Sequence, residues 1–295
     1  MVTDRADQVV EAAATRLAAG EVGAWFDGGS ELGPRALGAR SIVADPRSRA
    51  MKEHVNGRVK RREPFRPLAP AILAEHADAW FHTGAGSSPF MLRSWPFRTE
   101  GAQQVPAVVH HDGTGRVQTV EPDQLARFHE LIARFHARTG VPLILNTSLN
   151  GPGEPIAETP QDALWCMLDL GLDFVAFEDR IVAPAPDAPS LLDLVPVVAC
   201  LSYTVRQRGP HEGSRLSVTV RTAWGDRELA LPDPLATVLA LVDGSSTVRE
   251  LTRTLGPGTS AERAALDAIR LLRRQGVLDL DVRRGSGDPP RQVER

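Results

Sequence analysis

Hydrophobic residues recur with helical and strand periods in alternation along the first 184 residues. Residues 5–19 place Val9, Val10, Ala13 and Leu17 on one helical face. We expect the following elements in order: helix 5–19, strand 22–26, strand 41–44, helix 48–59, strand 68–73, strands 105–110 and 118–120, helix 122–139, strand 141–145, helix 160–170, and strands 174–177 and 180–183. Their alternation predicts an α/β domain in which helices pack on a sheet.

Several boundaries carry their own local signals. Ser48 is a candidate cap for helix 48–59, and Thr159 followed by Pro160 is a typical helix start. Prolines at 67 and 70 favour an edge position or a bulge for strand 68–73, because proline cannot donate to a sheet ladder.

The pattern changes after the stretch APAPDAPS at 183–190, whose composition is typical of a linker. We divide the chain into a first domain at 1–184, a linker at 185–191, a second domain at 192–284 and a disordered tail at 285–295. In the second domain we expect strands at 197–207 and 216–222, helices at 235–242, 248–255 and 261–275, and a closing strand in VLDLDV. Three short helices closed by a strand predict a small winged-helix α+β domain.

Bulk composition excludes some classes of function. A formal net charge of −3 gives no electrostatic reason to expect nucleic acid or an acidic membrane as a partner. No apolar run is long enough to span a bilayer, and the N-terminus lacks the features of a signal peptide, so we expect a cytoplasmic protein. The two cysteines, Cys166 and Cys200, lie in apolar surroundings and are interpreted as small buried residues.

The densest polar signal is the string ELGPRALGARSIVADPR at 31–47. Gly33 and Gly38 bracket Arg35, and glycine backbone lets a ligand approach closely while N–H groups point at an anion. Arg35 and Arg40 add forked donors that suit phosphate or carboxylate. Taken alone, this string also fits a tight turn that carries surface arginines.

A second string, VKRREPFRP at 59–67, contains four cations: Lys60, Arg61, Arg62 and Arg66. A solvated run of charge is the usual explanation for such density. Pro64, Phe65 and Pro67 would instead hold the cations rigidly, and rigid cations beside a glycine-rich turn form a phosphate cradle.

Two further strings complete the candidate chemistry. HHDGTGRVQT at 110–119 is a polar glycine loop with Arg116 as its single cation, and its two histidines are either acid/base groups or structural residues. In LILNTSLN, Asn146, Ser148 and Asn150 emerge from the end of a buried strand, where ligands of open α/β sheets bind. Glu154 follows, either as a residue that orients a cation or ribose or as a solvated loop acid.

In order along the chain, GPRALGARSIVADPR, VKRREPFRPLAP, HHDGTGRVQTV and NTSLNGPGEPI with TPQDAL resemble the C-terminal, YrdC-like domain of the O-carbamoyltransferase family. The resemblance covers residues 20–183 and implies a twisted mixed sheet with helices. Members of that family carbamoylate antibiotics and nodulation factors. The implied reaction converts carbamoyl phosphate to carbamate, which ATP adenylates to carbamoyl-adenylate. An N-terminal domain of the sugar-kinase/actin-like ATPase fold then transfers the carbamoyl group to a hydroxyl.

The resemblance also implies roles for individual residues. The K-x-R and S-x-N arrangement of YrdC-like relatives matches Lys60-x-Arg62 and Ser148-x-Asn150. We expect Lys60, Arg35 and Arg66 to be catalytic. The expected ATP and carbamoyl phosphate site consists of Arg35, Lys60, Arg62, Arg66, Arg116, Asn146, Ser148 and Asn150. Positioned cations stabilise the charge that develops on the phosphates, and Mg²⁺ is expected to arrive with the nucleotide rather than at a protein metal site.

Two departures from the family pattern qualify this expectation. The acceptor-transfer domain is absent from the chain, which suggests a split or stand-alone activating half that works with a separate transfer subunit, or a remnant. Family members usually carry a bulkier residue at the position of Leu149 and an asparagine at that of Ala39.

Residues 192–282 resemble PqqD-like winged-helix modules through LALVDGSSTVRELTRTL and AIRLLRRQGVLDLDV. Such modules often bind the leader segment of a ribosomally made peptide at a sheet edge, although a purely structural annex fits equally well. Two functions therefore stay open: a carbamoyl-activating enzyme, and a non-catalytic partner that binds nucleotide and recruits a peptide. A YrdC-like enzyme acting on bicarbonate and an amino acid is disfavoured by the carbamoyltransferase-type strings.

Overall fold

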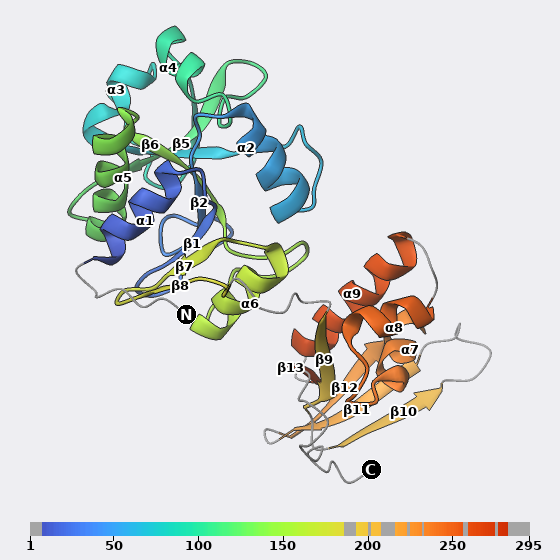
Figure 1. Cartoon of the computed structure of the whole chain (residues 1–295). Coiled ribbons are helices and arrows are strands. Elements are labelled where there is room, and N and C mark those ends of the chain that lie inside the picture. The colour runs from blue at the N-terminus through green and yellow to red at the C-terminus, as the bar shows by residue number, and fades with distance from the viewer. Residues whose placement is uncertain are drawn as a thin grey trace. The chain divides into compact units, whose positions relative to one another are not determined.

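A mixed sheet of eight strands organises the first unit, Met1–Asp187, in the order β4-β5-β3-β6-β2-β1-β7-β8 (Figure 1). The pairs β1–β7 and β3–β5 are parallel and the other neighbours are antiparallel. The strands are β1 Gly23–Phe26, β2 Arg40–Ala44, β3 Ala69–Leu73, β4 Arg93–Pro96, β5 Thr114–Val120, β6 Leu143–Ser148, β7 Phe174–Ala176 and β8 Ile181–Val182. The expected α/β fold class is confirmed.

The computed structural model describes residues 8–185, 193–199, 202–207, 216–222, 225–231, 233–255, 259–274 and 277–282. The two compact units divide between Asp187 and Ala188, inside the predicted linker, and each is described by itself. The start of the predicted helix 5–19, the residue Cys200 and the tail 285–295 lie outside the described residues. Within them, no helix combines the length and apolar character needed to cross a membrane.

Helices cover the sheet of the first unit, and the long helix α5 packs along α1 and against β3 and β6 (Figure 1). The helical segments are α1 Val9–Ala18, α2 Arg49–His54, the π-helical turn η1 Val55–Val59, the 3-10 turn η2 Ala74–His76, α3 Ala77–Trp80, α4 Thr99–Gln104, α5 Ala126–Thr139 and α6 Pro160–Leu170. Phe128, Leu131, Ile132 and Phe135 form the buried face of α5, which is the helical period that the sequence shows.

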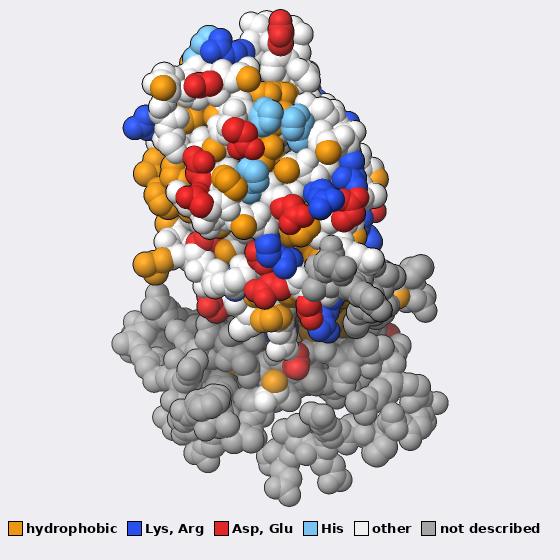
Figure 2. Space-filling view, turned by 90° about the vertical axis from the view of Figure 1, so that its left-hand side faces the viewer, with side chains coloured by type: hydrophobic (Ala, Val, Ile, Leu, Met, Phe, Trp, Pro, Cys, Tyr) orange, Lys and Arg blue, Asp and Glu red, His pale blue; other side chains and the backbone are white. Residues whose placement is uncertain are grey.

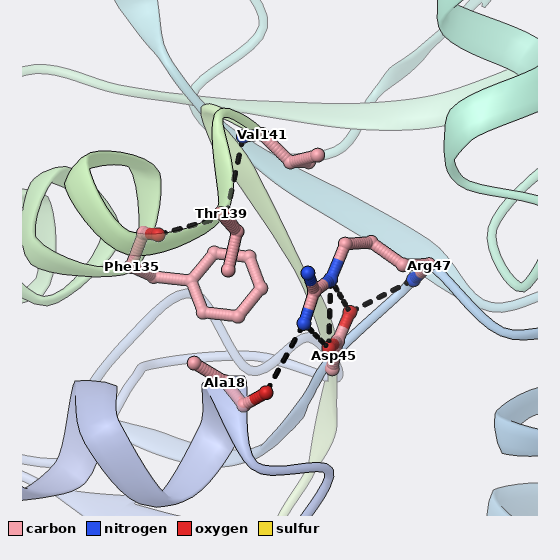
Figure 3. A network of polar contacts seen from close by, with 6 residues as sticks. All are labelled: Ala18, Asp45, Arg47, Phe135, Thr139 and Val141. Carbon is pink, nitrogen blue, oxygen red and sulfur yellow. Dashed lines mark hydrogen bonds and ion pairs between the residues drawn. The ribbon is translucent and has the colours of Figure 1, made fainter.

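A polar network joins three of these elements at the end of β2 (Figure 3). The Nη2 atom of Arg47 donates to the Ala18 carbonyl at 3.1 Å, and its Nε lies 2.9 Å from Oδ2 of Asp45. The guanidinium also lies 5.7 Å from the Phe135 ring centroid on α5. One arginine thus ties the end of α1 and the buried face of α5 to the turn after β2.

The predicted helix start at Thr159 and Pro160 is confirmed, whereas Ser48 precedes α2 without making a side-chain capping hydrogen bond. The Thr159 side chain accepts from the Asp162 N–H, the Asp162 carboxylate accepts from the Thr159 N–H, and Pro160 is the first helical residue. This reciprocal pair satisfies two donors at the start of α6. Gly140 ends α5 in the left-handed conformation, with φ 74°, which glycine adopts without steric cost.

Three expectations for the first unit are wrong. The segment 105–110 forms turns rather than a strand, although Val105 and Val108 are buried, because Pro106 interrupts the run and Val108 N–H closes a turn onto the Val105 carbonyl. Helix α5 begins at Ala126 rather than 122, since the N–H groups of residues 124 and 125 both turn back to the Glu121 carbonyl.

The third concerns β3, for which the prolines predict an edge position or a bulge. The strand lies between β5 and β6 inside the sheet. Pro70 pairs with Leu145 of β6, but the ladder with β5 starts only at Ala71. The proline therefore lies where its missing N–H removes no hydrogen bond to β5.

The second unit contains two small sheets and three helices among its described residues. Strands β10, β11 and β12 form an antiparallel sheet, and β9 pairs antiparallel with β13. The elements are β9 Leu194–Val198, β10 Ser202–Gln207, β11 Leu216–Thr222, β12 Gly225–Leu231, α7 Asp233–Leu241, α8 Val248–Leu255, α9 Thr259–Arg274 and β13 Leu278–Val282. The predicted strand 197–207 is thus two strands in different sheets, and β12 was not predicted. The winged-helix assignment stays a prediction.

Candidate functional site

Lys60, at the end of η1, lies at the centre of polar groups at the end of β6 and in the loop that follows it. Its Nζ atom donates to the Ser148 carbonyl at 2.9 Å and to the Asn150 side-chain oxygen at 2.7 Å. The Asn150 carbonyl at 2.9 Å and the Ser148 hydroxyl at 3.3 Å complete its surroundings. Ser148 Oγ in turn donates to Asn150 Oδ1 at 2.6 Å. The structure therefore brings together Lys60, Ser148 and Asn150, three residues expected at one site.

The electrostatic state of Lys60 follows from its burial. The residue is only 7% exposed, and this burial, with the nearby charge of Arg62, lowers the pKa of its ammonium group to about 8. The oxygens that contact it are neutral, so they satisfy its hydrogens without supplying a counter-charge. An anion arriving beside Lys60 would supply the charge that these contacts do not.

The π-helical turn η1 accounts for the position of Lys60. The Lys60 N–H donates to the Val55 carbonyl at 2.7 Å, and Arg61 then adopts a positive φ of 46°. Inserting an extra residue into a helical turn changes the direction in which the following side chains emerge, and such turns often occur at functional sites. Strain of this kind is kept only where the surroundings over-determine it.

Four arginines form a cluster of like charge next to this lysine. Burial lowers the pKa of Arg62, and the positive charges of Arg66 and Arg116 lower it further. Burial likewise lowers the pKa of Arg116, and the charge of Arg35 adds to the effect. Like charges near one another oppose folding unless something else holds them there. The cations of three separate segments therefore lie near enough to one another to interact electrostatically.

Arg66 and Arg116 differ in their hydrogen-bond and ion-pair partners. Arg66 pairs with Glu63 at 3.2 Å on the exposed surface. The Nε atom of Arg116 is buried and has no hydrogen-bond partner. An unsatisfied buried donor is rare in native proteins, so the Arg116 guanidinium is suited to an acceptor that a ligand would bring.

A carboxylate organises the loop that carries Arg35. Oε1 of Glu31 accepts from the backbone N–H groups of Leu37 at 2.7 Å, Ala39 at 2.8 Å and Arg40 at 3.1 Å. Arg35 itself is exposed. The loop thus closes on Glu31 and leaves the Arg35 side chain on its outside.

Asn146 does not lie where the sequence suggested. Strand β6 continues to Ser148, so Asn146 lies within the sheet and is only 2% exposed. Its Nδ2 donates to Gln118 Oε1 at 2.8 Å and to the Ala36 carbonyl at 3.2 Å, while Gln118 Nε2 donates to the Leu37 carbonyl at 2.6 Å. These two buried amides hold the Arg35 loop from beneath rather than meeting the solvent.

Arg40 was expected to offer its donors to phosphate, but its surroundings in the structure are different. It is buried, and its guanidinium donates to the carbonyls of Asp27, Gly28 and Ala39 at 3.0 to 3.1 Å. It also lies 3.5 Å from the Phe26 ring centroid. Its two Nη atoms donate to backbone and hold the loop, while its buried Nε has no hydrogen-bond partner.

The remaining singled-out groups have mainly structural surroundings. Cys166 is buried, as expected, and burial raises the pKa of its thiol to about 12. Glu154 Oε2 accepts from the Gly151 N–H at 3.0 Å, which shapes the loop after β6. Nδ1 of His110 lies 3.1 Å from Thr114 Oγ1, and burial lowers its pKa, so the neutral ring is favoured.

In the part of the chain that the structure describes, no group of three or more His, Cys, Asp and Glu side chains is arranged to hold a metal ion. The face drawn in Figure 2 mixes acidic, basic and histidine side chains on the first unit.

Comparison with known proteins places the first unit in a family. A family model described as Carbamoyltransferase C-terminus matches residues 14–183. The chain belongs to this carbamoyltransferase family. That assignment agrees with the resemblance drawn from the four sequence strings.

Curated relatives extend the likeness over different parts of the chain. Nodulation protein NolNO of Sinorhizobium fredii is 34% identical over 280 residues, which cover 92% of this chain and 41% of the relative. Nodulation protein NolO of Bradyrhizobium diazoefficiens is 39% identical over 184 residues, covering 62% of this chain and 34% of the relative. The match to NolNO therefore extends beyond the family model, and the chain spans less than half the length of these two relatives.

Solved structures show only distant likeness. A doubly substituted variant of Sua5 from P. abyssi matches with a TM-score of 0.42 and 13% identity over 91% of this chain and 85% of its own. Full-length HypF in its phosphate- and nucleotide-bound form matches with a TM-score of 0.40 and 14% identity over 91% of this chain and 32% of its own. With TM-scores below 0.5, these two superpositions carry no argument about function.

Proposed function

We propose that the first unit of this carbamoyltransferase-family chain activates a carbamoyl group by adenylation. Carbamoyl phosphate and water would give carbamate and phosphate. A carbamate oxygen would then attack the α-phosphorus of ATP, forming the oxygen–phosphorus bond of carbamoyl-adenylate and releasing pyrophosphate. Both substrates are small polyanions, which suits a site that gathers positive charge.

The observation that carries the proposal is the gathering of cations around Lys60. The charges of Arg66 and Arg116 lower the pKa of Arg62, the charge of Arg35 lowers that of Arg116, and Arg62 acts in the same way on Lys60. Concentrated, pre-positioned cations in a half-buried site stabilise charge that moves between phosphates without a covalent nucleophile. Mg²⁺ would enter with the nucleotide, since the described residues offer no carboxylate cage for it.

A hydroxyl acceptor would receive the carbamoyl group on a separate transfer subunit. The chain spans 41% of NolNO and 34% of NolO. On the second unit we propose a PqqD-like module that binds a leader peptide, supported by the three helices α7, α8 and α9 packed on a common core with β13.

The test is an exchange of labelled pyrophosphate into ATP that depends on carbamoyl phosphate. Exchange detects adenylate formation on an isolated activating half, because it needs the reverse reaction and no hydroxyl acceptor. We expect exchange with the full chain, and none when carbamoyl phosphate is omitted. If ATP binds but no exchange occurs with or without a transfer subunit, the chain is a non-catalytic nucleotide-binding partner instead.

A further inference from the structure

A single buried amide fixes the backbone on both sides of Phe65. Asn56 in η1 is 0% exposed, and its Nδ2 donates to the carbonyls of Pro64 at 3.2 Å and Arg66 at 2.9 Å. Its Oδ1 accepts from Nε of Arg62 at 2.8 Å. The carbonyl groups of Pro64 and Arg66, the two residues next to Phe65, and the Arg62 guanidinium are therefore held by the same side chain.

Phe65 is held in place without being buried. Its side chain is 79% exposed, and the turn that contains it is closed by the Arg66 N–H donating to the Glu63 carbonyl at 3.1 Å. Single exposed apolar residues are common and need no explanation. This one differs because its backbone is fixed, and because it lies in the chain between two arginines of the cationic cluster.

We propose that Phe65 is the stacking platform for the base of the nucleotide, with Asn56 as the residue that positions it. This inference rests on the proposed function, which places a triphosphate on the cations. A nucleobase has a flat π-face that stacks on aromatic rings. A fixed backbone reduces the conformational freedom that stacking would otherwise remove.

The size of the effect follows from known stacking contributions. Removing an aromatic platform weakens binding by roughly 5- to 150-fold per base. Tripolyphosphate carries the phosphate chain without base or ribose, so its binding reports on the cations alone. The difference between ATP and tripolyphosphate therefore reports on the base and ribose, and the change in that difference on replacing Phe65 reports on the contribution of its ring.

The competing explanation for the exposed apolar side chains of the first unit is a surface on which another protein docks. Leu32, Phe90 and Leu92 are also large and exposed; Leu32 lies in the Arg35 loop, and Leu92 immediately precedes β4, the partner strand of β5. A docked protein would use several of them together. A base would depend on Phe65 and leave Phe90 without effect, so Phe90→Ala is the matched control.

The experiment measures calorimetric Kd values of the full chain for ATP and for tripolyphosphate in four proteins: wild type, Phe65→Ala, Phe65→Tyr and Phe90→Ala. We expect Phe65→Ala to weaken ATP binding at least about fivefold while leaving tripolyphosphate binding within about twofold. Phe65→Tyr should retain wild-type affinity for both ligands, because its ring keeps the stacking face. Phe90→Ala should match wild type throughout.

Different failures have different meanings. If wild type binds neither ligand, the proposed function fails and the base subsite with it. If wild type binds both but Phe65→Ala binds ATP normally, only the subsite is wrong and a protein contact becomes the explanation for the exposed ring. Equal weakening of both ligands by Phe65→Ala would also overturn the subsite, because Phe65 would then act on the phosphate site.

Discussion

Oδ1 of Asn150 lies 2.7 Å from Nζ of Lys60, although the two residues are separated by ninety positions in the chain. This contact joins the end of the π-helical turn η1 to the loop that follows strand β6. It brings the K-x-R and S-x-N strings together, because the lysine of the first contacts the Ser148 and Asn150 carbonyls of the second. Lys60 can therefore act on an anion and on the shape of its binding loop at the same time.

Replacing Lys60 with methionine should abolish catalysis and leave the fold intact. Methionine keeps most of the buried volume but removes the ammonium group, and losing one charge-stabilising group in a site of this kind costs roughly 100-fold or more in rate. The measurement is pyrophosphate exchange with urea unfolding in parallel. Lys52→Met on α2 is the matched control and should keep wild-type exchange. Equal exchange in Lys60→Met and wild type would show that Lys60 has no catalytic role.

The affinity of the chain for ATP should fall as pH rises above about 8. In the free protein, burial lowers the pKa of Lys60 from 10.5 to about 8, and bound phosphate should raise it again. Below about pH 8 the ammonium is charged in both states and affinity is constant. Above it, binding requires proton uptake, so Kd should rise by up to about tenfold per pH unit. Calorimetry between about pH 7.5 and 9.5 measures this slope, which should vanish in Lys60→Met.

The same pKa has the opposite effect on stability. A lysine whose folded pKa is lowered destabilises the fold while it is charged, and this cost is relieved as pH rises from about 8 towards 10.5. Wild type should therefore gain stability relative to Lys60→Met over that window, as seen in urea unfolding. A difference between the two proteins that stays constant with pH would mean that the pKa of Lys60 is not lowered.

Sequence patterns predicted the frame of the first unit because its signals are local. The helix start at Thr159 and Pro160 depends on residues within one helical turn of each other, and it is present. Pro70 misled the prediction for β3 because its effect depends on which neighbouring strand pairs with each side of it. That information lies in the sheet order, which no local pattern contains.

The residues of the candidate site were likewise predicted only in part. Lys60, Ser148 and Asn150 were expected at one site and lie in contact. Gln118 and Asn56 were missed, because nothing in their local strings distinguishes a buried amide that holds two loops from a surface one. Polar residues beside strings rich in cations would be the only signal for them.

Arg35 and Arg40 should give opposite phenotypes when each is replaced by alanine. Arg40 is buried and donates to three backbone carbonyls, so its loss should destabilise the fold by roughly 2–4 kcal/mol. Arg35 is exposed, so its loss should change stability by less than about 0.5 kcal/mol while abolishing pyrophosphate exchange. Urea unfolding and exchange on the same two preparations measure both quantities. Loss of stability in Arg35→Ala would contradict its place on the outside of the loop.

Glu31 should control catalysis through the loop that carries Arg35. Its Oε1 accepts three backbone N–H groups, from Leu37, Ala39 and Arg40. Glutamine keeps that acceptor, so Glu31→Gln should retain most exchange activity, whereas Glu31→Leu leaves the three donors without a partner and should lose it. Hydrogen exchange at those three amides separates this role from a general loss of stability, because their protection should fall in Glu31→Leu while that of the α5 amides persists. Unchanged protection together with lost activity would place Glu31 in direct contact with the substrate instead.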